Sequence, residues 1–83
     1  RSVTTRGGYV AGSCRHGLVT VSASPAVGWR IDQIDRSPTE EATVKFRQSS
    51  GDGEVEVHAT CSGGEARFVV GDDRSSGSGG GDR

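Results

Sequence analysis

The chain has 83 residues and a formal net charge of −1, with eleven acidic residues against nine Arg and one Lys. This length allows a single domain, and the balanced charge excludes a basic patch of the kind that binds nucleic acid. Leu, Ile, Val and Phe make up fewer than one residue in five, and ten of them are valines. We therefore expect a β domain with a small hydrophobic core, which a covalent cross-link would stabilise.

The folded unit is expected over residues 9–70, preceded by a lead-in or edge strand at residues 1–8. Within it, apolar residues recur at every second position, which is the period of a β-strand and not of a helix. Clusters of Gly, Pro, Ser and Asp separate the alternating stretches and indicate turns. Together they predict strands at residues 9–15, 18–24, 29–34, 42–47, 54–62 and 65–70.

The first hairpin is expected where His16 and Gly17 form a two-residue turn. Cys14 then lies opposite Val19. Because side chains alternate between the faces of a strand, this places Cys14 on the apolar face of the pair. Its neighbours on that face are Val10, Val19, Val21 and Ala23.

The strand at residues 29–34 begins with the single tryptophan of the chain. Alternation places Trp29 and Ile31 on one face and the charged Arg30 and Asp32 on the other. We therefore expect Trp29 in the core and not on a sugar-binding platform. The segment "DRSPTEE" that follows has too few residues for a helix and is expected to be a crossover loop.

The last three strands predict two further hairpins. Pairing Phe46 with Val55 buries both side chains and brings opposite charges together on the solvent side. The Gly-Gly turn after Cys61 puts this cysteine opposite Ala66, again on an apolar face. The predicted core side chains are Trp29, Ile31, Val44, Phe46, Val57 and Phe68.

Residues 71–83 contain no apolar side chain, and we expect a disordered, Gly/Ser-rich linker or tail there. No stretch of these residues has the pattern of a signal peptide, and no apolar run is long enough to cross a membrane, so we expect neither element within this segment. Because methionine is absent, we expect a segment of a longer or processed chain.

The two cysteines, Cys14 and Cys61, allow three interpretations. A disulfide is favoured, because closing a loop of about 48 residues would contribute about 4 kcal/mol to a domain with little core. A Cys2His2 zinc site with His16 and His58 has poor ligand spacing. A Cys14 nucleophile with His16 as its base lacks an orienting acid. We accordingly expect no metal, no cofactor and no catalytic residue.

These elements predict an all-β fold, namely a small immunoglobulin-like antiparallel β-sandwich of about six to seven strands with one inter-sheet disulfide. The order Cys14, Trp29, Cys61 resembles the rhythm of immunoglobulin-like domains, in which the tryptophan packs on the disulfide. The chain departs from that pattern in its shorter length and in Ala59, which stands where the corner tyrosine would be.

A longer resemblance covers most of residues 14–64. The run "SCRHGLVTVSASPAVGWRIDQIDRSPTEEATVKF", followed by "VEVHATCSGG", resembles a small extracytoplasmic domain of actinobacterial membrane-anchored signalling proteins, anti-sigma-factor-like or kinase-like. The resemblance implies a secreted or membrane-anchored ectodomain, tethered to a membrane protein outside this segment, and transfers no catalytic residue. The matching positions are Cys14, Pro25, Gly28, Trp29, Pro38, Val44, Phe46 and Cys61.

The expected function is a non-catalytic extracytoplasmic binding or sensing module at the cell envelope, with an envelope protein or a glycan as partner. The candidate surface combines "SPAVGW" and "DRSPTEE" with Arg30, Asp32 and Arg36. One alternative is a structural spacer or assembly module that associates weakly with itself through strand edges. Another is a carbohydrate-binding module, which would normally need more exposed aromatic side chains than this chain offers.

Overall fold

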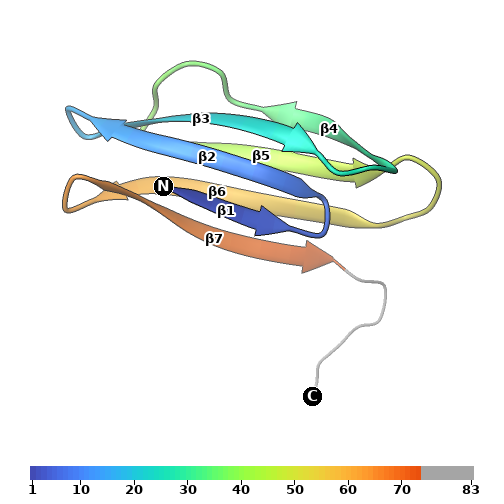
Figure 1. Cartoon of the computed structure of the whole chain (residues 1–83). Helices are drawn as coiled ribbons and strands as arrows, with labels where there is room; N and C mark the ends of the chain where they lie inside the picture. Colours follow the sequence, from blue (N-terminus) through green and yellow to red (C-terminus); the bar gives the residue numbers. More distant parts are fainter. Residues whose placement is uncertain (74–83) are drawn as a thin grey trace.

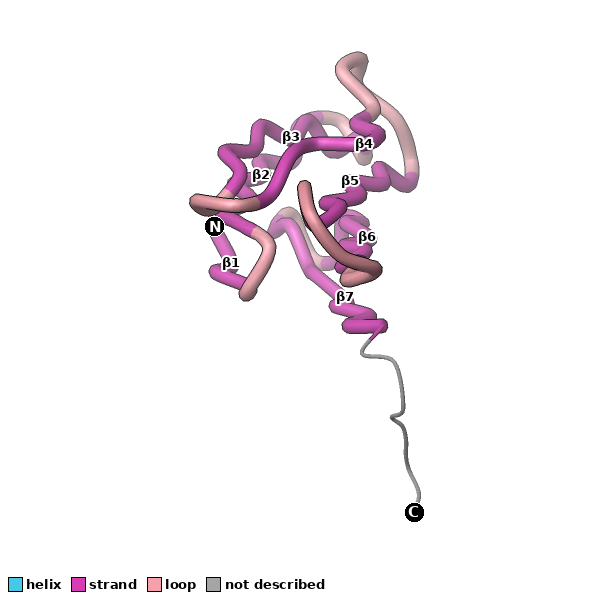
Figure 2. The backbone as a smooth tube through the Cα atoms, turned by 90° about the vertical axis from the view of Figure 1, so that its right-hand side faces the viewer, coloured by secondary structure: helices cyan, strands magenta, loops and turns pink. Residues whose placement is uncertain are grey.

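The computed structural model describes residues 1–73 and contains seven strands and no helix within that range (Figure 1). The strands form an antiparallel sheet in the order β1-β2-β3 and a second antiparallel sheet in the order β4-β5-β6-β7. The two sheets pack face to face (Figure 2), so the predicted β-sandwich is confirmed. The strands are β1 (Ser2–Thr5), β2 (Gly8–Arg15), β3 (Leu18–Pro25), β4 (Trp29–Ile34), β5 (Glu41–Gln48), β6 (Glu54–Ser62) and β7 (Glu65–Asp73).

The three predicted hairpins form with the predicted registers. In β2 and β3, Cys14 pairs with Val19, and in β6 and β7, Cys61 pairs with Ala66. The β5–β6 pairing also agrees with the prediction. His16 adopts a φ of 56°, the left-handed conformation that a two-residue hairpin turn requires and that few non-glycine residues adopt. No helix among residues 1–73 has the length and apolarity to cross a membrane.

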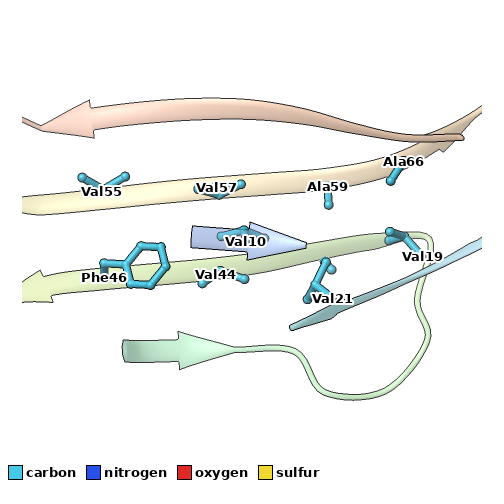
Figure 3. Packing of buried hydrophobic residues seen from close by; sticks show 10 residues of the cluster. Val10, Val19, Val21, Val44, Phe46, Val55, Val57, Ala59 and Ala66 are labelled. Atoms are coloured by element: carbon cyan, nitrogen blue, oxygen red, sulfur yellow. The ribbon is translucent and has the colours of Figure 1, made fainter. Parts of the chain in front are cut away.

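The core lies between the sheets and consists of small aliphatic side chains around one phenylalanine (Figure 3). Three of the predicted core residues are fully buried or nearly so, namely Val44, Phe46 and Val57. The other three are partly buried and pack against the margin of the core: Trp29, Ile31 and Phe68. The complete buried set is Val10, Val19, Val21, Ala42, Val44, Phe46, Val55, Val57, Ala59 and Ala66.

The folded unit is longer at both ends than residues 9–70. At the N-terminal end, β1 pairs with β2 and forms the edge strand expected of residues 1–8. At the other end, β7 continues through Asp73, three residues past the expected boundary at Val70, and Gly71 pairs with Glu56 of β6. Backbone pairing needs no apolar side chain, so the loss of apolar residues after Val70 does not end the strand. Residues 74–83 of the predicted tail lie outside the described residues.

The connections of this sandwich differ from those of an immunoglobulin domain. Within each sheet the strands follow one another in chain order, and the described chain passes between the sheets once, from β3 to β4. Immunoglobulin sandwiches use Greek-key connections that distribute consecutive strands between the sheets. The likeness is therefore confined to two packed antiparallel sheets with a disulfide between them.

Candidate functional site

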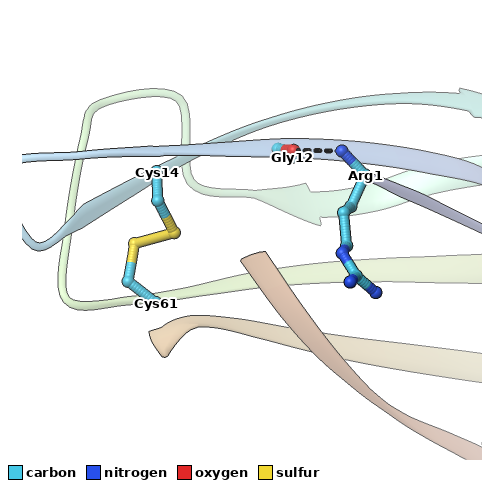
Figure 4. The surroundings of a disulfide bond; sticks show 4 residues. All are labelled: Arg1, Gly12, Cys14 and Cys61. Atoms are coloured by element: carbon cyan, nitrogen blue, oxygen red, sulfur yellow. Dashed lines mark hydrogen bonds between the residues drawn. A yellow bond between two sulfur atoms is a disulfide. The ribbon is translucent and has the colours of Figure 1, made fainter. Parts of the chain in front are cut away.

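A disulfide joins Cys14 of β2 to Cys61 of β6 and thereby links the two sheets at one end of the sandwich (Figure 4). The Cα atoms of the two residues are 5.7 Å apart, and the predicted cross-link is confirmed. Because each sulfur is bonded to the other, neither is available as a nucleophile or as a metal ligand. His58 lies on the outer face of β6, with its ring nitrogens 3.5 Å from Glu41 and 3.4 Å from Glu56. The cysteines and this histidine therefore do not form one site.

Trp29 lies at the opposite end of the sandwich from the disulfide. It pairs with Gln48 at the end of β5 and is therefore level with the beginning of β6. Cys61 lies near the far end of β6. At the usual rise per residue, the two levels are separated by about 23 Å along the strand. The expectation that Trp29 packs on the disulfide is wrong, because β4 begins at the end where β6 also begins.

The indole ring of Trp29 is covered by Arg6 and approached closely by glycine backbone. The Arg6 guanidinium carbon lies 4.9 Å from the ring centroid, and Nε of Arg6 donates to both carboxylate oxygens of Asp72, at 2.7 and 2.8 Å. A Cβ atom on Gly7 or on Gly53 would lie only 3.1 Å from a ring carbon. The ring therefore closes this end of the sandwich by packing and does not present a free face to a sugar.

The structure brings together two of the three residues predicted to bind a partner and separates the third from them. Arg30 lies at the start of β4, directly opposite Arg47 of β5. Asp32 lies in a bulge of β4, with its carboxylate 3.6 Å from the Arg47 guanidinium. Arg36 lies in the loop beyond the other end of β4. All three are exposed. Arg30 and Asp32 both lie beside Arg47, whereas "SPAVGW" and "DRSPTEE" stand at opposite ends of β4, so Arg36 lies apart from the other two.

The outer face of the four-stranded sheet is rich in charges of both signs. Arg47 lies between Asp32 and Glu54, at 3.6 and 3.5 Å, and His58 lies between two glutamates. Partly exposed pairs of this kind neutralise one another locally and contribute little to stability. This face therefore offers no concentrated charge of one sign to a ligand.

Among residues 1–73, the outer face of the three-stranded sheet carries hydroxyl groups and has no charged side chain between its ends. In the cross-strand rows, Ser2 and Ser22 flank Ala11, and Thr4 and Ser24 flank Tyr9. We call this surface the hydroxyl face. It consists of Ser2, Thr4, Tyr9, Ala11, Ser13, Thr20, Ser22 and Ser24.

A shallow, open depression of about 440 Å³ lies on the hydroxyl face across its three strands. Tyr9 lines it and is 46% exposed. Among the described residues, the hydroxyl groups of Ser13, Thr20 and Ser22 take part in no side-chain hydrogen bond, so each can donate to and accept from a ligand. Arg1 reaches the margin of the depression, but its guanidinium donates to a carboxylate oxygen of Glu65 at 2.6 Å.

The hydroxyl face was not among the predicted surfaces, although its signal is present in the sequence. In "SVT" at residues 2–4 and "TVSAS" at residues 20–24, hydroxyl residues alternate with apolar ones. The period that places the valines in the core also places these hydroxyl groups together on the outside. Only the pairing of β1 with β2 and of β2 with β3 shows that the hydroxyl groups of the three strands lie side by side.

Comparison of the chain with protein-family models, with curated proteins and with solved structures finds no match. The two outer faces of the sandwich differ in character, since one carries charges of both signs and the other carries hydroxyl groups.

Proposed function

We propose that the chain is a non-catalytic binding module that works outside the cytoplasm, at the cell envelope, with the hydroxyl face as its binding surface. The disulfide between the sheets supports the location, because such bonds persist in oxidising compartments and are rare in the cytosol. The resemblance to ectodomains of actinobacterial signalling proteins supports a sensing role, in which the module is tethered to a membrane protein and responds to an envelope ligand.

The neutrality of the hydroxyl face is the observation that carries this proposal. A face with several unpartnered hydroxyl groups and one exposed aromatic ring suits a neutral, hydroxylated ligand, for which a glycan is the common example. Sugar hydroxyls can exchange hydrogen bonds with Ser13, Thr20 and Ser22, while the apolar side of a sugar ring packs on the ring of Tyr9. A charged ligand would find no counter-charge here, because Arg1 at the margin already pairs with Glu65.

The shape of the surface indicates how such a ligand would lie. Sites for small molecules are concave and bury most of the ligand, whereas the depression beside Tyr9 is open and shallow. An extended oligosaccharide lying across β1, β2 and β3 would contact the exposed side chains of each strand in turn. We therefore favour a chain-like glycan over a small compact ligand.

The proposal can be tested by titrating the isotope-labelled chain with neutral oligosaccharides and following the amide NMR signals. Oligomers of N-acetylglucosamine and of mannose at up to about 5 mM cover the weak affinities expected of an open surface. We expect shifts at residues of β1, β2 and β3 and none on the outer face of β5 and β6. Tyr9→Ala should weaken binding about tenfold, which corresponds to about 1.4 kcal/mol.

Leu18→Ala provides the matched control, because Leu18 is exposed on the same face but lies at the disulfide end, outside the depression. This variant should bind as the unchanged chain does. Shifts confined to the charged face, or an equal loss of affinity in both variants, would contradict the assignment of the hydroxyl face. The absence of any shift with both sugars would reject a glycan as the ligand.

A further inference from the structure

The four edges of the two sheets differ in how well they are protected against pairing with another strand. An unprotected edge presents free N–H and C=O groups to any other extended chain, and proteins usually block it. β1 is only four residues long. β3 ends in Pro25, and Val19 exchanges two backbone hydrogen bonds with Thr39, at 2.8 and 3.1 Å. β4 is interrupted by a bulge at Asp32.

β7 carries none of these protections. It spans nine residues, contains no proline, and pairs with β6 without a register shift. It lies at the border of the four-stranded sheet, and no strand of residues 1–73 lies beyond it (Figures 1 and 2). It also exposes apolar side chains, since Val69 is 69% exposed and Val70 is 41% exposed. This edge is therefore long and regular, and its middle, from Phe68 to Val70, is apolar, whereas charged residues flank it on both sides.

The pairing of β7 with β6 determines which backbone groups face outward. Ser62 and Glu65 flank the two-residue turn and form a hydrogen-bonded pair. In an antiparallel ladder such pairs alternate with pairs whose N–H and C=O groups point away. The backbone groups of Ala66, Phe68 and Val70 therefore point toward the free edge.

We propose that this edge binds a second copy of the chain, with the two β7 strands antiparallel and centred on Val69, so that the two four-stranded sheets become one continuous sheet. In this register Phe68 faces the second copy's Val70, and Val69 faces the second copy's Val69. Arg67 faces the second copy's Gly71, so two arginines do not oppose each other. The proposed pairing runs from Arg67 to Gly71, because farther out the acidic Glu65 would stand opposite the second copy's acidic Asp73. Interactions between Phe and β-branched residues across strands are among the favourable cross-strand pairs.

Self-pairing explains the exposed apolar residues of β7 better than pairing with an unrelated strand. A two-fold axis at Val69 brings Phe68 and Val70 together twice, once on each side of the axis. The hydrogen bonds along the new ladder use the outward N–H and C=O groups of the same two residues. One strand pair buries less than the roughly 800 Å² per partner of a standard interface. We therefore expect weak, concentration-dependent association.

Sedimentation equilibrium of the complete, oxidised chain tests the proposal directly. Between about 10 μM and about 1 mM, the apparent mass should rise from the 8.6 kDa of one chain toward twice that value. Val69→Lys should keep the mass at 8.6 kDa throughout, because two lysines would face each other at the axis. Val69→Glu should do the same. An equimolar mixture of the two variants should restore the dimer, since Lys then faces Glu.

Val27→Lys is the matched control for added charge, because Val27 is fully exposed in the turn between β3 and β4, outside both β7 and the hydroxyl face. It should dimerise as the unchanged chain does. A mass of 8.6 kDa over the whole range for the unchanged chain would overturn the proposal. A dimer that persists in Val69→Lys would overturn it as well, as would a mixture of the Lys and Glu variants that stays monomeric. The hydroxyl face lies on the other sheet, so failure of this test leaves the proposed function untouched.

Discussion

At one end of the sandwich a covalent bond joins Cys14 to Cys61, whereas at the other end Trp29 is held under Arg6 by non-covalent contacts alone. The disulfide acts mainly by restricting the unfolded chain. The tryptophan end acts by packing in the folded state, and it requires glycine beside the indole ring, because a Cβ atom on Gly7 or Gly53 would lie only 3.1 Å from a ring carbon. The two ends should therefore fail for different reasons, and the following experiments separate them.

The largest effect is expected at the covalent end. Replacing both cysteines by alanine should lower the free energy of unfolding by about 4 kcal/mol, because the loop between them is no longer closed in the unfolded chain. Denaturant titration without reductant measures the change. The unchanged chain in reductant is the matched control and should unfold at a similar midpoint. If the double variant were as stable as the oxidised chain, the bond would contribute nothing to the fold.

The next largest effect is expected from Trp29→Ala, at about 3 kcal/mol, near the lower limit for large aromatic truncations because the ring is only partly buried. Thermal unfolding followed by far-ultraviolet circular dichroism measures it without relying on tryptophan fluorescence. Trp29→Phe keeps most of the apolar area and should lose about 1 kcal/mol. Full stability of Trp29→Ala would show that the ring does not close the sandwich.

A smaller, purely steric effect is expected from Gly7→Ala. The new methyl group would lie 2.8 Å from Cβ of the buried Phe46, so the backbone or the ring must move, at a cost of about 1–3 kcal/mol. Gly71→Ala is the control, because its methyl group would meet only the Glu56 carbonyl oxygen, at 3.9 Å. Both are measured by denaturant titration. Equal stability of the two variants would argue against tight packing at this end.

The smallest effects concern the ion pairs at the two ends of β1. Arg6–Asp72 at the tryptophan end is 31% and 30% exposed, whereas Arg1–Glu65 at the disulfide end is 62% and 53% exposed. Arg6→Gln should cost about 1 kcal/mol, since it also removes the contact with the Trp29 ring. Arg1→Gln should cost less than about 0.5 kcal/mol. Comparable losses in both variants would mean that the covering of Trp29 adds nothing.

The local pairing of this protein follows directly from its sequence. The period of two, the two-residue turns and the inward position of both cysteines predict the hairpins in the observed register, because a one-residue slip would turn every valine outward. The disulfide follows from the same reasoning, since both cysteines share the apolar side of their hairpins. The hairpin registers relate strands that follow one another in the chain, and the alternating pattern also states which side of its hairpin each cysteine occupies.

The arrangement of the hairpins was decided only by the tertiary structure. Within residues 1–73 the chain crosses between the sheets once, from β3 to β4. As a result β4 begins at the end opposite the disulfide, which separates Trp29 from Cys61. The order of the strands also places the hydroxyl groups of β1, β2 and β3 on one face, and it leaves β7 at an edge of its sheet. Alternation states which side of a strand a residue occupies but not which strand lies beside it. That choice depends on how two apolar faces cover each other, and many sheet orders satisfy the same pattern.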